Sequence, residues 1–163
     1  MRANVKYKLS DPENFRQKLL TWINRHSVFC YLDSNNYYNQ SKSGLFYHTY
    51  DTIAGIDFDD IVESGHNNAF ASLKKFVNSK NDWLFGYFAY DLKNEIENLT
   101  SENFDGIGFP DLKFYRPKIV FVIKGDKMEI QYLKKYYSRD EINSLTNFIE
   151  NIEFNPSIKL VEE

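Results

Sequence analysis

Hydrophobic residues recur with helical spacing in three segments of this chain. The first follows Ser10, which lies three residues before Glu13 as in a capping box, with Pro12 in a first-turn position. The third follows Ser138, which has Glu141 at the same spacing. Side chains three or four residues apart share one face of a helix, so each segment predicts an amphipathic helix. The apolar positions are Phe15, Leu19, Trp22 and Ile23, then Ala69, Phe70, Leu73, Phe76 and Val77, and finally Ile142, Leu145, Phe148, Ile149 and Ile152.

Shorter apolar runs bounded by turn-forming residues predict β-strands. The run Trp83–Tyr90 is apolar at nearly every position, as is typical of a strand covered on both faces. Gly86 within it indicates a bulge or a second backbone close by. A Gly-Asp pair separates the last two runs and suits a two-residue turn, so these two strands should form an antiparallel hairpin. The predicted strands cover residues 4–9, 28–32, 45–50, 52–56 with a break near Gly55, 83–90, 118–123 and 128–133.

Strands outnumber helices in this pattern. It predicts an α+β fold, in which helices pack on a largely antiparallel sheet. Residues 99–117 show little periodicity and are expected to be a loop. At 163 residues the chain suits a single domain, for which we take residues 1–155, and residues 156–163 are expected to form a fraying tail.

Composition excludes several classes of function. A net charge of −3 gives no large positive field to attract nucleic acid or anionic lipid. The N-terminus lacks the apolar core of a signal peptide, and no stretch approaches 18 apolar residues. Cys30 is the only cysteine, so an internal disulfide and a zinc cluster are excluded. We therefore expect a cytoplasmic protein without a nucleic-acid or membrane partner.

No residues show the spacing of a catalytic or metal site. The three histidines are far apart, at His26, His48 and His66. The acidic cluster consists of Asp57, Asp59 and Asp60. It lacks the glycine and the further ligands of a calcium loop, so a solvated turn is expected there. Glu95 and Glu97 would not share a helix face and make a poor acid–base pair. The residues alone thus predict no catalytic residue and no metal ligand.

The most specific pattern lies between Trp83 and Pro117. The sequence GYFAYD, which contains Gly86, Tyr87, Tyr90 and Asp91, resembles a GYFSYD motif, and LKNEIE follows it directly. Further on, Pro110 and the FYRP that ends at Pro117 resemble a P…FYxP junction, and Leu32, Asp33 and Ser34 resemble an LES-type motif. Taken together, residues 5–135 resemble the N-terminal domain of component I of the chorismate-aminating synthases. The LKNEIE continuation resembles the aminodeoxychorismate (para-aminobenzoate) synthase branch.

This resemblance implies a division of labour between domains. In the family, the catalytic groups and the Mg²⁺-binding glutamates belong to a C-terminal chorismate-binding domain, and ammonia comes from a glutamine amidotransferase, component II. The resemblance therefore implies that the chain is a fragment with no cofactor of its own, inactive alone, and partnered by those two components. The complete enzyme would convert chorismate to 4-amino-4-deoxychorismate, on the route to p-aminobenzoate and folate.

The resemblance also implies a ligand pocket. In the family the LES-type motif lines a site for tryptophan, which would place Leu32, Asp33 and Ser34 beside that ligand. Asp33 stands where glutamate is usual and is shorter by one methylene, and Ala89 replaces a common serine. An interpretation without a ligand is also open, because a run of Asp, Ser and Asn forms turns through its own side chains.

Two other functions fit the same residues. One is the N-terminal domain of anthranilate synthase component I, which differs in the product formed by the missing domain. The other is a stand-alone domain that binds a small molecule with its many tyrosines.

Overall fold

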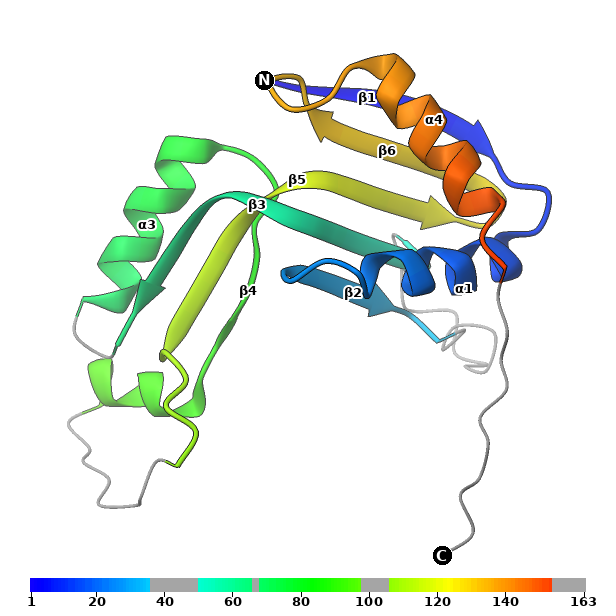
Figure 1. Cartoon of the computed structure of the whole chain (residues 1–163). Coiled ribbons are helices and arrows are strands. Elements are labelled where there is room, and N and C mark those ends of the chain that lie inside the picture. Colours follow the sequence, from blue (N-terminus) through cyan, green and yellow to red (C-terminus); the bar gives the residue numbers. More distant parts are fainter. Residues whose placement is uncertain (36–49, 66–67, 98–105, 154–163) are drawn as a thin grey trace, which may run out of the picture.

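The computed structural model describes residues 1–35, 50–65, 68–97 and 106–153. Its elements form an α+β fold, as predicted, with helices beside a six-stranded antiparallel sheet in the order β1-β6-β5-β3-β2, and β4 pairs with β5 off this path (Figure 1). The elements are β1 (Arg2–Lys8), α1 (Pro12–Ile23), β2 (Phe29–Asp33), β3 (Thr52–Ser64), α3 (Ala69–Lys80), β4 (Phe85–Phe88), the 3-10 helix η1 (Tyr90–Glu95), β5 (Leu112–Lys124), β6 (Lys127–Leu133) and α4 (Arg139–Glu150).

The two longest strands, β3 and β5, bend together and divide the sheet into two arms (Figure 1). Their register shifts between Phe58 and Asp60, so β3 carries a bulge there, and Asp57 just before it has φ +53°. Pro117 of β5 pairs with Phe58 at this point. A proline has no N–H for the ladder and is tolerated at a bulge. One arm therefore carries β1, β6 and β2, and the other carries β4.

Among the described residues, three hydrophobic clusters hold the fold. The largest lies between the sheet and helices α1 and α4, with Phe121, Ile123 and Ile130 fully buried. A smaller one joins α3 and η1 to the other arm through Ala69 and Leu92. The remaining cluster consists of strand residues and their flanking segments, namely Phe85, Tyr115, Val120 and Val122 with Val28, Cys30, Ile53, Ile61 and Trp83 packed against them.

The helix predictions succeed where burial follows local spacing. In α1 all four predicted positions are buried, and in α4 the capping box of Ser138 and Glu141 is present. The start of α1 was predicted one residue early, because Asp11, rather than Ser10, accepts the hydrogen bond from the Asn14 backbone. Not every predicted apolar position is buried, since Phe70, Val77 and Phe148 are exposed.

The strand predictions were less accurate. The hairpin of β5 and β6 is confirmed, with Gly125 at φ +56° in its turn. The strand expected over residues 83–90 is only Phe85–Phe88, and three of its four residues are exposed, so it is not covered on both faces. Residues 112–117 belong to β5 and not to a loop, and β3 continues through Gly55 without a break. The strand predicted for residues 45–50 lies almost entirely outside the described residues.

Candidate functional site

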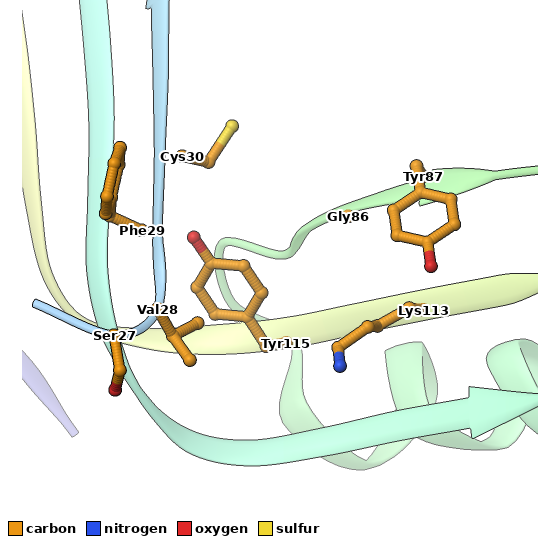
Figure 2. Close-up of a pocket in the computed structure, with 8 residues that line it drawn as sticks. All are labelled: Ser27, Val28, Phe29, Cys30, Gly86, Tyr87, Lys113 and Tyr115. Atoms are coloured by element: carbon orange, nitrogen blue, oxygen red, sulfur yellow. The ribbon is translucent and has the colours of Figure 1, made fainter. Parts of the chain in front are cut away.

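A hollow of about 460 Å³ opens in the angle between the two arms of the sheet. Figure 2 shows β2 on one side of the hollow and β4 on the other side, with Tyr115 of β5 between them. Residues from three distant parts of the sequence meet here because the sheet bends. The lining residues are Ser27, Val28, Phe29, Cys30, Gly86, Tyr87, Lys113 and Tyr115. A volume of this size suits a small organic ligand, since such sites usually measure about 300–1,000 Å³.

Gly86 allows β4 to approach β5 closely. A Cβ atom on Gly86 would lie 2.0 Å from the Lys113 carbonyl oxygen and 2.6 Å from the Cα of Phe114. Such distances are far inside van der Waals contact, so no other residue fits without moving the strand. The close backbone approach that the sequence predicted at Gly86 is therefore confirmed, and it places Gly86 and Tyr87 of the GYFAYD segment on one wall of the hollow.

Two neutral groups line the hollow. The Tyr115 hydroxyl donates a hydrogen bond of 3.0 Å to the Gly55 carbonyl oxygen, and burial raises the pKa of this phenol. Burial also raises the pKa of the Cys30 thiol, which is half-buried. Both groups therefore stay protonated at neutral pH.

The charged group on the lining is Lys113. Its ammonium nitrogen lies 2.5 Å from a carboxylate oxygen of Glu63, the residue that faces it across β3 and β5. Both side chains are partly exposed to solvent, so the pair is a surface ion pair. One carboxylate contact leaves further donors on the ammonium.

The three residues of the LES-type motif lie near the other end of β2. Leu32 is 55% exposed. Asp33 accepts hydrogen bonds from the Asn35 backbone N–H at 2.7 Å and from the Tyr31 hydroxyl at 3.1 Å, while the Ser34 backbone N–H donates to Asp51. This carboxylate thus organises the turn after β2. The motif does not contribute to the hollow's lining, because the lining residues in this part of the chain are 27–30.

The rest of the GYFAYD segment lies at the exposed edge beyond β4. Tyr90 is 82% exposed, and the Lys93 ammonium lies 4.1 Å from the centre of its ring. The same ammonium lies 3.3 Å from the Asp91 carboxylate. Pro110 is half-buried just before β5, and Pro117 is buried within β5, where its carbonyl oxygen accepts a hydrogen bond from Arg2. The hollow is not lined by any of the four predicted residues, which are Tyr90, Asp91, Pro110 and Pro117.

The acidic cluster was expected to be a solvated turn, and this prediction is wrong, because the cluster is part of the bulged strand β3. Each carboxylate has a specific partner. Asp57 lies 3.0 Å from His26, Asp60 pairs with Lys80, and Asp59 pairs with Arg116 and Lys135 and accepts from the Tyr136 hydroxyl. The ion pair with Lys80 lowers the pKa of Asp60, and the Asp59 side chain is only 2% exposed. These contacts explain the cluster as structural.

Glu95 has a role that sequence reasoning missed. Its carboxylate accepts hydrogen bonds from the backbone N–H groups of Ala69 at 2.7 Å and Phe70 at 3.2 Å, the first residues of α3. Asn68 at the N-cap makes no side-chain cap of its own, so Glu95 supplies the cap from a distant segment. No local signal reveals this, because the two segments are 26 residues apart.

Replacing Glu95 with alanine should lower the free energy of unfolding by about 1 kcal/mol, the usual cost of a lost helix cap. Thermal unfolding followed by circular dichroism measures this difference. Glu97→Ala is the matched control, because Glu97 is exposed in the same segment, and it should leave stability almost unchanged. Equal stabilities for the two variants would show that the Glu95 contacts contribute nothing.

Within residues 1–35, 50–65, 68–97 and 106–153, no three His, Cys, Asp or Glu side chains are grouped so that they could hold a metal ion. His48 and His66 lie outside these ranges. The helices within the same ranges are too short or too polar to cross a membrane.

The fold and the site together define an α+β domain with a hollow of ligand size in the angle of a bent sheet. No protein-family model matches the chain. It is similar to anthranilate synthase component 1 of Cereibacter sphaeroides, with 43% identity over 47 residues. The match covers 29% of this chain and 9% of that relative, so the chain spans only a small part of the relative's length.

Proposed function

We propose that this chain is the N-terminal, non-catalytic domain of component I of a chorismate-utilising synthase. The observation that carries the proposal is the 43% identity over 47 residues to anthranilate synthase component 1. The order of the LDS, GYFAYD and FYRP segments agrees with it. The geometry also fits a non-catalytic part, since the acidic residues 57, 59, 60 and 95 are engaged with His26, in ion pairs with Lys or Arg, or in a helix cap.

Within that class, we favour aminodeoxychorismate synthase. The LKNEIE segment after GYFAYD supports this branch by resemblance. In the structure the first four residues of this segment belong to η1, where Leu92 is buried against α3 and Glu95 caps that helix. The complete enzyme would add ammonia from a glutamine amidotransferase to chorismate, in a C-terminal domain that binds Mg²⁺. Anthranilate synthase is the second candidate, favoured by the name of the matched relative.

A direct assay tests the non-catalytic part of this proposal. The purified chain is incubated with chorismate, Mg²⁺ and ammonium, and the mixture is analysed for anthranilate and 4-amino-4-deoxychorismate. We expect neither product, because the groups that activate chorismate would belong to the other domain. Turnover that follows the amount of this chain would overturn the proposal. A complete component I assayed in parallel is the positive control.

The tryptophan-type pocket at Leu32, Asp33 and Ser34 belongs to the same proposal. An exposed leucine beside a hydroxyl and a carboxylate offers an apolar surface for an indole and acceptors for an ammonium group. A ligand at a hundred times its dissociation constant stabilises a fold by about 2.7 kcal/mol. We therefore expect millimolar tryptophan to raise the melting temperature by roughly 5–10 °C.

Scanning fluorimetry measures this shift, with phenylalanine as the ligand control. Leu32→Ala should remove the shift, whereas Leu20→Ala, a change at a 40% exposed leucine on α1, should keep it. An unchanged melting temperature for the wild-type chain in tryptophan would exclude the pocket.

A further inference from the structure

We propose that the hollow between β2 and β4 binds a planar aromatic acid, with aromatic rings on its walls contacting the ligand and Lys113 holding the anionic group. This site differs from the tryptophan-type pocket, because its lining comes from residues 27–30 and from β4 and β5, and not from residues 32–34. The inference is independent of the proposed function, since it involves neither chorismate nor a second domain.

The walls favour a flat, apolar ligand. Tyr87 is 36% exposed and its ring lies on the β4 side of the hollow, while the ring of Tyr115 lies between β2 and β4 (Figure 2). Gly86, which precedes Tyr87 in β4, also lines the hollow. Aromatic rings contribute beyond buried area when they stack or meet edge to face. A ring system inserted between β2 and β4 would make such contacts with Tyr87 and Tyr115.

The aromatic walls are held in place before any ligand arrives. Phe85 stacks on Tyr115 with ring centroids 6.1 Å apart, and Phe109 contacts Tyr87 at the same separation. The Tyr115 hydroxyl is fixed further by its hydrogen bond to Gly55. Groups that are already ordered lose less entropy on binding, so a preorganised pocket binds more tightly than a loose one of equal area.

The electrostatics favour an anion. Cys30 and Tyr115 remain neutral, because burial raises the pKa of each group. Lys113 is the charged residue on the lining, and its partner Glu63 does not line the hollow. The Lys113 ammonium has three N–H donors. A carboxylate on the ligand would accept a hydrogen bond from a donor that Glu63 does not use. A charged group on a ligand is therefore expected to be negative.

Cys30 makes the site measurable, because it is the only cysteine of the chain and it lines the hollow. The probe is 2-naphthoate, and the readout is the rate at which the Cys30 thiol reacts with a disulfide reagent such as DTNB. Saturating 2-naphthoate should slow this reaction at least tenfold. Calorimetry gives the affinity without using the thiol. Two matched compounds separate the contributions: 2-naphthamide has the ring without the charge, and cyclohexanecarboxylate has the charge without the planar ring. Each should bind at least tenfold more weakly.

Two substitutions on β5 test the role of Lys113. Lys113→Met should weaken 2-naphthoate about tenfold and leave 2-naphthamide unchanged, a pattern that a purely structural role would not produce. Lys124→Met removes the same charge at an exposed position on the same strand and should leave both affinities unchanged. Tyr87→Ala should weaken both compounds.

Three results would overturn the inference. The first is that Cys30 of the wild-type chain reacts with DTNB at the same rate with and without low-millimolar 2-naphthoate, and that calorimetry detects no heat of binding. Another is equal affinity of the wild-type chain for 2-naphthoate and 2-naphthamide, a comparison that needs no variant to fold. The third is equal loss of affinity in the two lysine variants.

Discussion

Replacing Asp59 with alanine should lower the free energy of unfolding by about 3–5 kcal/mol, the range for breaking a buried ion pair from one side. The Asp59 side chain is 2% exposed and pairs with Arg116, which is 17% exposed. Burial lowers the pKa of the Arg116 guanidinium, and the positive charge of Arg2 lowers it further. Without Asp59, this cation would remain buried beside another cation. The Arg116 Nε atom already has no hydrogen-bond partner among the described residues.

Asp59 also connects distant parts of the chain. Its carboxylate contacts Lys135 and accepts a 2.7 Å hydrogen bond from the Tyr136 hydroxyl, and both residues follow β6. The change should lower the melting temperature by roughly 10 °C. Asp60→Ala is the matched control, because Asp60 is 45% exposed and pairs with Lys80 at the surface, where an ion pair contributes about 1 kcal/mol or less. Urea titrations of both variants measure the difference. Equal stability of the two would contradict the buried role of Asp59.

Gly86→Ala should destabilise the protein by about 3 kcal/mol or more, because the added methyl group meets two backbone atoms of β5. Its Cβ would lie 2.0 Å from the Lys113 carbonyl oxygen, and a backbone atom held in a strand cannot turn aside as a flexible side chain does. We expect β4 to separate from β5, which would also disrupt the wall of the hollow formed by Tyr87. The melting temperature should fall by roughly 10 °C.

Gly65→Ala is the control for this change. A Cβ on Gly65 would meet Asp111 at 4.0 Å, an ordinary contact, so this variant should unfold within about 0.5 kcal/mol of the wild type. Chemical denaturation followed by tryptophan fluorescence compares the two, since Trp83 lies close to β4 and contacts Phe85. A Gly86→Ala protein as stable as Gly65→Ala would show that β4 does not approach β5 as described.

The helices were largely predictable because their signals are local. The buried face of α1 and the capping box at Ser138 depend on residues within one or two turns. The first half of β5 was missed because Lys113, Arg116 and Pro117 interrupt its apolar pattern. Those residues form a strand because β3 pairs with them on one side and β4 pairs with residues 112–115 on the other side, and that pairing depends on tertiary structure.

The candidate site was predictable only in part. Gly86 within an apolar run gave a correct signal of close backbone approach. The contributions of Cys30, Lys113 and Tyr115 could not be foreseen, because the bend at the β3 bulge brings them together. The acidic cluster was misinterpreted because its partners are also distant in the sequence. Nothing near Asp59 in the sequence indicates that cations 57 and 76 residues away would neutralise it.

The central claim is that this chain works with a chorismate-binding domain, and the most direct test is its state in the source cells. An antibody raised against the chain would isolate the native protein, and mass spectrometry would identify everything that the antibody retains. We expect peptides of a chorismate-binding domain, on the same polypeptide or in a stable complex with it. Recovery of a 19.3 kDa species without any such sequence would contradict the claim.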